Sequence, residues 1–445
     1  MYVNICLTFY RHPIKFQQVL KHFYSPRKGF DLKKRIVITG LGTLNAIANN
    51  VPDFARSLKK GICGIGAIDL FDTTGFHSQT GGQIKNFIAR DYIPEKFSMK
   101  RMSRADKLSL AATLEALHDA ELYPSPKELK EEIGIAIGGG AGGLLEAEEF
   151  YSDYLKNNGK DVNFCKLSSL FCASSTDCIA STFGFSGPKI TFMTACSAGA
   201  TAIGYARDLI VNDQASIMIA GGVEPMCRLT YAAFNALKSV DPATCRPFDK
   251  NRAGLSLGEA AAIMVLESLD SALNRGAKIY GEILGYGITC DSFHMTAPDE
   301  QASGAVRCMQ AALKDGCLNI EDIDYINAHG TATPVNDLTE TKAIKEVFGK
   351  RAYSIPVSST KSMHAHTLGA SGALEGIVSV LALRHGFIPS TINYQESDPQ
   401  CDLDYVTTGT RKVELRAVLS NSFAFGGNNT TLIFGKYSDG GALNE

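Results

Sequence analysis

The feature that most constrains the fold of this chain is a regular alternation of strand-like and helix-like segments. The strand-like runs of the N-terminal part are short and apolar, and they cover residues 34–42, 133–137, 190–195 and 215–220. Those of the C-terminal part cover residues 279–285, 323–328, 418–421 and 431–434. Helix-like segments lie between them, at 197–212, 302–315 and 371–384. This alternation predicts an α/β protein whose sheets are covered by helices.

Glycines follow several of these runs. The first run ends in a glycine turn at Gly40 and Gly42, and the fourth ends in Gly221–Gly222. The two parts share a similar rhythm, which is compatible with an internally duplicated fold, but their sequences are not alike enough to establish a repeat. Because no low-complexity linker separates the two parts, we expect one compact body.

Composition narrows the classes of function. The chain has 445 residues, of which 45% are hydrophobic and 20% are charged, as in ordinary globular proteins. Its net charge of -2 gives no reason to expect nucleic acid or a membrane surface as a partner. No apolar run reaches the roughly 18 residues that a membrane span requires. The cysteines form no C-x-x-C pair, which argues against a zinc ribbon and favours reduced thiols in the cytoplasm.

Residues 1–33 differ from the rest of the chain. Residues 1–30 contain basic side chains and no acidic ones. Such a leader fits an organelle transit peptide, but this one is poor in serine and lacks a small-residue cleavage site. We therefore expect residues 1–33 to form a poorly ordered basic extension, with organelle import as the alternative.

Cys196 is the strongest candidate for a reactive residue. It lies in Thr194-Ala-Cys-Ser197, where a strand-like run ends and a helix-like segment begins. A thiol at this position meets the positive end of the helix dipole and the free N–H groups of the first turn, which favour the nucleophilic thiolate. The alternative is a buried cysteine that only packs. The small neighbouring residues favour a nucleophile suited to thioester exchange.

Two histidines stand in similar settings. His329 follows a strand-like run and precedes Gly330-Thr-Ala-Thr333, whose hydroxyls suit an amide-rich ligand arm. His366 lies in a serine- and glycine-rich loop, five residues after Lys361. One cysteine and two histidines, each at a strand end or glycine turn, predict thioester chemistry. His364 and His366 also form an H-x-H pair, but without further ligands nearby in the sequence we expect no metal there.

Two glycine-rich segments complete the candidate site. A turn at Gly426 and Gly427 can present backbone N–H groups to an oxyanion, with Phe425 as a packing residue or a gate. Gly138-Gly-Gly-Ala-Gly-Gly143 fits the G-x-G-x-x-G pattern of dinucleotide sites, although no acidic residue ends a second strand about twenty residues later. A nucleotide-binding oxidoreductase is therefore one alternative. The simpler interpretation is that these glycines form the wall of a site that holds an apolar chain.

Several motifs occur together and in one order. They are Thr194-Ala-Cys-Ser197, Arg246-Pro-Phe-Asp-Lys250, Phe293-His-Met-Thr-Ala-Pro298, His329-Gly-Thr331, Ser359-Thr-Lys-Ser-Met363 and Phe425-Gly-Gly427. In this order they resemble the β-ketoacyl-acyl-carrier-protein synthases, the condensing enzymes of fatty-acid and polyketide synthesis. The chain is most similar to the type II elongating synthases. The resemblance covers about residues 34–437.

The resemblance implies a fold and partners. The fold is the α/β thiolase-like fold, with two similar βαβαβ halves stacked in α-β-α-β-α layers. The N-terminal half, 34–278, carries the nucleophile, the C-terminal half, 279–437, carries both histidines, and 438–445 form a tail. Members of the family are usually homodimers. They receive their substrates on the phosphopantetheine of acyl carrier protein and use no metal, nucleotide or other cofactor.

The resemblance also implies roles for individual residues. Cys196 matches the nucleophile that becomes acylated, and His329 and His366 match the pair that acts on malonyl-carrier. Lys361 matches the lysine that supports the His366 region, and Glu340 matches an acidic residue behind the site. The chemistry agrees, because two neutral imidazoles can stabilise the enolate oxygen that forms when a malonyl thioester loses CO2.

Other matched residues surround the substrate. Thr331 and Thr333 match the threonines that contact the pantetheine arm. The backbone N–H groups of Cys196 and Phe425 match the oxyanion hole, and Phe425 also stands where the family has its gate. Ala141 occupies a position in the pocket wall at which a larger side chain is often found.

Some positions depart from the family pattern around the acyl pocket and its gate. They are Ala141, Asn336, His364, Ala365, Ala424 and Asn428, together with a segment at 167–177 that is shorter than its fatty-acid counterpart. The cysteine and both histidines are unchanged. A thiolase would need a second catalytic cysteine near Phe425, and a primer-type synthase would have asparagine in place of His366.

We therefore expect a decarboxylative Claisen condensation that yields 3-oxoacyl-acyl-carrier protein in fatty-acid elongation. A specialised type II polyketide or polyene ketosynthase with the same chemistry is the main alternative. A non-catalytic partner subunit is a further alternative, against which the intact nucleophile Cys196 argues.

Overall fold

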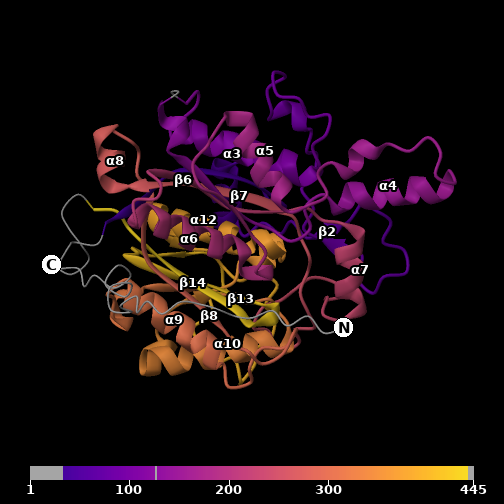
Figure 1. Ribbon diagram of the computed structural model, residues 1–445. Helices are drawn as coiled ribbons and strands as arrows, with labels where there is room; N and C mark the ends of the chain where they lie inside the picture. Colours follow the sequence, from indigo (N-terminus) through magenta and orange to yellow (C-terminus); the bar gives the residue numbers. More distant parts are fainter. Residues whose placement is uncertain (1–33, 126–127, 439–445) are drawn as a thin grey trace, which may run out of the picture. The chain divides into compact units, whose positions relative to one another are not determined.

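The computed structural model describes residues 34–125 and 128–438 (Figure 1). The predicted extension 1–33 and all but the first residue of the tail 438–445 lie outside the described residues. The large sheet takes five strands from the N-terminal part: β1 (Ile36–Asn45), β4 (Ile133–Gly138), β5 (Lys189–Phe192), β6 (Ile217–Glu224) and β7 (Ala260–Ser268). It takes five more from the C-terminal part: β8 (Gly281–Cys290), β9 (Tyr325–Asn327), β10 (Val357–Ser358), β13 (Ala417–Ala424) and β14 (Asn428–Gly435). Two small ribbons pair β2 (Gly66–Ala67) with β3 (Thr80–Gly81), and β11 (Phe387–Ile388) with β12 (Arg411–Lys412).

The two sets of five strands have the same topology. Their order is β5-β4-β6-β7-β1 in the N-terminal set and β10-β9-β13-β14-β8 in the C-terminal set. When the strands of each set are numbered along the chain, both orders become 3-2-4-5-1. From the outer edge inwards, both sets contain two parallel pairings and then two antiparallel ones. The sets meet where β1 and β8 pair through Val37 with Glu282 and Ile38 with Gly281. This shared topology reveals an internal duplication that sequence comparison of the two parts did not establish.

Helices separate and cover the two sets of strands (Figure 1). On the N-terminal set, the outer helices are α3 (Arg104–Asp119) and α5 (Ala173–Phe183). Between the sets lie α6 (Ala198–Val211) and α12 (Ser371–His385), which contact strands of both. On the far side, α9 (Ser303–Asp315) packs on β8 and β14, and α10 (Pro334–Phe348) packs on α9. The expected α-β-α-β-α layers are confirmed, and the apolar core follows them.

The other helices are shorter or lie in the connections. They are α2 (Val51–Lys60), α4 (Leu144–Lys156), α7 (Arg228–Ala236), α8 (Leu269–Asn274) and α11 (Lys361–His364). Across the described ranges, none of the helices has the length and apolarity that a bilayer crossing requires.

Small residues let the two central helices meet closely at their N-terminal ends. A Cβ atom at Gly372 would lie 2.6 Å from the Cβ of Ala200, and one at Gly199 would lie 2.9 Å from the Cβ of Ala373. Larger side chains would force the helices apart, because such distances are well inside van der Waals contact. Cys196 directly precedes α6, and His366 lies just before α12. The close contact therefore brings the predicted nucleophile and histidine together.

Two glycine pairs were assigned wrongly as strand ends. Gly40 and Gly42 lie inside β1, and Gly221 and Gly222 lie inside β6. A Cβ atom at Gly42 would lie 2.0 Å from the carbonyl oxygen of Ala112 in α3. Glycine is needed in β1 because a helix backbone packs directly on the strand, and not because the chain turns.

Candidate active site

Cys196 lies on a sharp turn between β5 and α6. A 3-10 turn, Ala195–Ser197, begins the helix, and Ala195 has a φ angle of 50°, which is left-handed for a residue with a side chain. The turn directs the Cys196 thiol inwards, where it is only 6% exposed. Its sulfur lies 3.1 Å from Nε2 of His366. The predicted position of Cys196 between a strand and a helix is confirmed.

Both predicted histidines reach the same point from the C-terminal half. His329 follows β9, and His366 lies between α11 and α12. The centroids of their rings are 5.4 Å apart, and the two rings are nearly perpendicular and buried. One ligating atom each from Cys196, His329 and His366 lies within 4.8 Å of the others. Nδ1 of His366 contacts the hydroxyl of Ser371 at 2.8 Å, so its Nε2 is held towards the sulfur.

Lys361 fixes the orientation of His329. Its ammonium forms a fully buried ion pair with Glu375 of α12 and lies 3.3 Å from Nδ1 of His329. An ammonium group cannot accept a hydrogen bond, so Nδ1 of His329 must be the acceptor. The ring proton is then on Nε2, available to an oxygen of the substrate. We expected Lys361 to support the His366 region, whereas its side chain directly contacts His329.

Burial keeps the three central groups uncharged. Burial, and then the charge of Lys361, lower the pKa values of His329 and His366 well below the usual range, so both rings are neutral at pH 7. Burial also raises the pKa of the Cys196 thiol to about 12, although Lys361 and the backbone N–H of Phe425 act in the opposite direction. The expectation of a resting thiolate was therefore wrong. Desolvation outweighs the helix terminus, and the adjacent Nε2 of His366 is placed to accept the thiol proton.

Glu340 holds the loop that carries His329. Its buried carboxylate accepts the backbone N–H groups of His329 and Gly330, each at 2.8 Å, and the side-chain amide of Asn421 at 3.2 Å. Glu340 thus lies behind the site, as the resemblance implied, and acts through the backbone. It does not touch the imidazole of His329 in any of these contacts.

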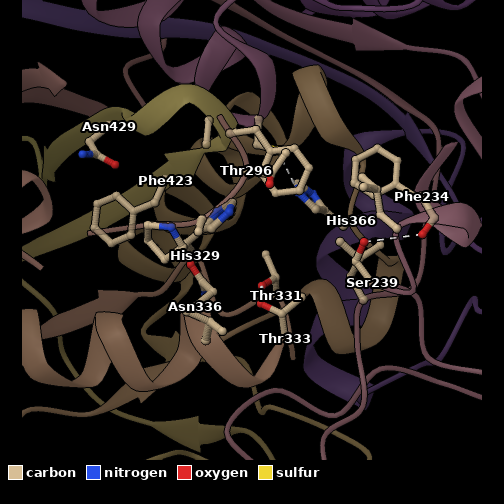
Figure 2. A pocket seen from close by; sticks show the side chains of 18 of the residues that line it. Phe234, Ser239, Thr296, His329, Thr331, Thr333, Asn336, His366, Phe423 and Asn429 are labelled. Carbon is tan, nitrogen blue, oxygen red and sulfur yellow. Dashed lines mark hydrogen bonds between the residues drawn. The ribbon is translucent and has the colours of Figure 1, made fainter. Parts of the chain in front are cut away.

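A cavity of about 250 Å³ opens onto these groups (Figure 2). Cys196, His329 and His366 line it together with Thr331, Thr333, Asn336, Phe425 and Phe234. The hydroxyls of Thr331 and Thr333 are 3.0 Å apart on one wall, and the ring of Phe425 stacks on that of Phe234 at 5.7 Å. The predicted hydroxyl-bearing wall and the aromatic gate thus lie at one cavity.

Ala141 does not line this cavity. It is buried beside Leu145 and Cys227, and its backbone N–H donates to Glu224 at 2.6 Å. The N–H of Gly140 donates to the same carboxylate at 2.9 Å. A dinucleotide phosphate would need these N–H groups free, so the Gly138–Gly143 loop does not suit that ligand.

The predicted metal alternative at His364 and His366 has no suitable geometry. Both ring nitrogens of His364 are engaged, one with the carbonyl of Ala365 and one with the hydroxyl of Thr360. The spacing of Cys196, His329 and His366 would itself suit a soft metal ion. However, Lys361 brings a positive charge to His329, which disfavours a second cation there.

Some residues of the site were missed in the sequence. Glu375, Ser371, Phe234 and Glu224 carried no motif that we singled out. Glu375 did leave a signal, since it is the only acidic residue in the mostly apolar segment 371–384. A charge in such a helix must be paired when the helix is buried, which would have pointed to Lys361.

Ala365, directly before His366, has a strained backbone. Its φ and ψ angles are 67° and 178°, a region that almost only glycine adopts. Ala365 is also one of the positions at which this sequence departs from the family pattern. The strain is stored in the loop that sets the position of His366.

The Lys361–Glu375 pair should be essential for stability. Replacing Lys361 by Met leaves a buried carboxylate unpaired and is expected to lower the free energy of unfolding by about 3–5 kcal/mol. The double variant Lys361→Met/Glu375→Gln is expected to recover most of that loss, as measured by urea unfolding. A double variant no more stable than Lys361→Met would contradict the pairing.

Relief of strain at Ala365 should stabilise the protein. The Ala365→Gly variant is expected to gain about 1 kcal/mol, since strain relief outweighs the added freedom of the unfolded chain. Ala120, buried with an ordinary φ of -81°, provides the control, because Ala120→Gly should destabilise. Urea midpoints of both variants test the difference in sign.

Comparisons with known proteins identify relatives of this chain. The N-terminal domain of beta-ketoacyl synthases matches residues 33–272, and their C-terminal domain matches residues 280–395. The curated 3-oxoacyl-acyl-carrier-protein synthase 2 of Synechocystis sp. is 43% identical over 412 residues, covering 91% of this chain and 99% of that protein.

Solved structures agree in fold. The ishigamide ketosynthase/chain length factor matches with a TM-score of 0.87 and 36% identity, over 91% of this chain and all of that one. A chain in the structure of a type II polyketide synthase acyl-carrier protein in complex with its ketosynthase matches with a TM-score of 0.83 and 30% identity. The match covers 91% of this chain and 100% of that one. Because the matched domains span both halves of the thiolase-like fold, this chain belongs to the beta-ketoacyl synthase family.

Proposed function

We propose that this protein condenses an acyl group held on Cys196 with malonyl-acyl-carrier protein, releasing CO2 and forming 3-oxoacyl-acyl-carrier protein. The observation that carries the proposal is the 3.1 Å contact between the Cys196 sulfur and Nε2 of His366, with His329 beside both. The named activity of the Synechocystis relative supports the same reaction, with fatty-acid elongation as the pathway.

In the first half-reaction, Cys196 takes the acyl group from its carrier. Nε2 of His366 accepts the thiol proton while the sulfur attacks the thioester carbonyl. The backbone N–H groups of Cys196 and Phe425 stabilise the oxyanion. When the C–S bond to the carrier breaks, the proton passes to the departing carrier thiolate, and His366 is neutral again.

In the second half-reaction, malonyl-carrier occupies the same cavity. Its carboxylate leaves as CO2, and the electron pair of the broken C–C bond forms an enolate. The Nε2–H of His329 donates to the enolate oxygen. His366 can donate from Nε2 in its other neutral tautomer, in which the Ser371 hydroxyl donates to Nδ1. Neutral imidazoles do this without becoming charged. The enolate carbon attacks the acyl carbonyl, the bond to Cys196 breaks, and the Cys196 thiolate takes up one proton from the solvent.

The cavity suits a carrier-bound substrate. Thr331 and Thr333 place hydroxyls beside the path to Cys196, where the amides of a pantetheine arm can bond to them. We propose acyl carrier protein as the partner, as in the polyketide synthase complex. Phe425, which lines the cavity with Cys196, acts as the gate, whereas Ala141 lies outside this cavity. No metal, nucleotide or other cofactor takes part in this scheme.

A specialised polyketide or polyene ketosynthase is the second candidate. The match to the ishigamide ketosynthase/chain length factor favours it, at a TM-score of 0.87. Both candidates share the same chemistry and differ in the acyl chain that Cys196 holds.

We further propose a homodimer formed through β5. This strand ends the large sheet and leaves one edge unpaired. Met193 follows it and is 66% exposed, and Phe171, 77% exposed, lies in a groove that also contains Lys189 of β5. An exposed sheet edge with large apolar side chains is a typical site of association.

The remaining proposals concern organisation and location. The duplicated topology supports halves at 34–278 and 279–437. The extension 1–33 and the tail 438–445 stay predictions from the sequence. The cysteines in the described part of the chain are all free, which supports a reducing, cytoplasmic location.

Mass spectrometry of the Cys196 adduct tests the proposed function. Purified protein mixed with acyl-acyl-carrier protein is expected to gain one acyl group on the peptide that contains Cys196. Adding malonyl-carrier should discharge it as 3-oxoacyl-carrier. The Cys196→Ala variant should form neither adduct nor product, and a variant that still condensed the two substrates would exclude this mechanism.

Alanine variants of the two histidines distinguish the two half-reactions. His329→Ala is expected to keep acylation and to lose condensation by about 100-fold or more, because it removes a donor to the enolate. His366→Ala should slow both half-reactions, since only His366 contacts the sulfur.

A further inference from the structure

The glycine loop after β4, residues 138–143, has a use that the proposed reaction does not explain. Its N–H groups at Gly140 and Ala141 donate to the carboxylate of Glu224, at 2.9 and 2.6 Å. Glu224 ends β6 and is 2% exposed. The loop therefore does bind an anion through its backbone, but that anion is a side chain of the same protein.

The same carboxylate also reaches the C-terminal half. Its Oε2 accepts the backbone N–H of Gly369 at 2.9 Å, three residues after His366. The two loops touch, since a Cβ atom at Gly369 would lie 2.7 Å from the Cα of Gly139. One buried side chain thus joins the loop beside Ala141 to the loop that carries His366.

Glutamate is the residue that this arrangement requires. Three N–H donors converge on two oxygens, and a carboxylate offers acceptors on both. A glutamine would turn its amide N–H groups towards at least one of these donors. An aspartate would keep the charge but is shorter by one methylene, so it could not span the same gap.

The charge of Glu224 also acts on the nearby thiols. It contributes to the raised pKa values of Cys172, Cys196 and Cys227, in each case after the larger effect of burial. Burial raises the pKa of Glu224 itself to about 7, against the effect of its three N–H donors. Glu224 is therefore close enough to Cys196 to influence its ionisation.

We propose that Glu224 is a positioning residue: it ties the glycine loop 138–143 to the His366 loop and thereby holds His366 against Cys196. The proposal rests on the proposed function only for the meaning of this contact in condensation. The tie itself is a property of the folded protein.

Glu224→Gln tests the proposal, with Glu115→Gln as the matched control. Glu115 is partly buried, has a pKa raised by burial to about 7 and accepts two backbone N–H groups, those of Thr43 and Val51. It supports the start of α2 and not the active site. The two variants therefore lose the same kind of carboxylate–backbone interaction in different places.

Two measurements on the full-length protein separate positioning from simple destabilisation. In Glu224→Gln, kcat for condensation is expected to fall about 10-fold or more, because a small displacement of a catalytic group is costly. The pH profile for alkylation of Cys196 by iodoacetamide, read by mass spectrometry, should shift to lower pH, because a charge that disfavours thiolate is gone. Glu115→Gln should change neither kcat nor the profile.

Glu224→Asp keeps the negative charge but shortens the side chain, so it distinguishes the effect of side-chain length from that of charge. It also serves as the test if Glu224→Gln does not fold. It is expected to lose kcat while keeping the alkylation profile of the unmodified protein. Unchanged kcat in both Glu224 variants, or equal losses in Glu115→Gln, would overturn the proposal. If the unmodified protein makes no 3-oxoacyl product, the proposed function fails, whereas the alkylation profiles still decide whether Glu224 acts on Cys196.

Discussion

A buried ammonium group is the interaction on which the active site depends. Lys361 has no access to solvent, and its charge is balanced by Glu375 of the central helix α12. A charge in such a place persists only when it is paired and hydrogen-bonded. The ammonium of Lys361 also contacts Nδ1 of His329, which keeps the ring proton on the opposite nitrogen. After the larger effect of burial, its charge lowers the pKa of His366 further and opposes the rise in the pKa of Cys196, so one cation influences all three reacting groups.

The duplicated fold explains why these groups meet where they do. Each half contributes a central helix, and small residues allow α6 and α12 to touch at the ends that carry Cys196 and His366. The loops at these ends hold strained residues, Ala195 before the cysteine and Ala365 before the histidine. The packing of the layers thus holds the reactive side chains in nearly fixed positions. Buried carboxylates fix the backbone around them. Glu340 does so for His329, and Glu224 links the His366 loop to the other half.

Much of this arrangement was predictable from the sequence, for physical reasons that also explain the failures. The predicted helices 197–212 and 371–384 lie within one residue of α6 and α12 at each end, and Cys196 stood out because a strand and a helix meet there. Gly40 and Gly42 were misread because a sequence shows a missing side chain without showing what packs in its place. The thiolate at Cys196 was misjudged because desolvation depends on surroundings from both halves. Glu224 was missed because its donors, at residues 140–141 and at Gly369, lie far from it and from each other in the chain.

Burial and the charge of Lys361 keep His329 neutral, and the contact with Lys361 keeps its ring proton on Nε2. Nitrogen NMR of the protein labelled with 15N in its histidines tests this most directly, because the two ring nitrogens of a neutral imidazole give distinct signals. From about pH 6 to 8, we expect His329 to show a protonated Nε2 and an unprotonated Nδ1, without titration. A His329 ring that becomes imidazolium in this range, or that carries its proton on Nδ1, would show that Lys361 does not have this effect.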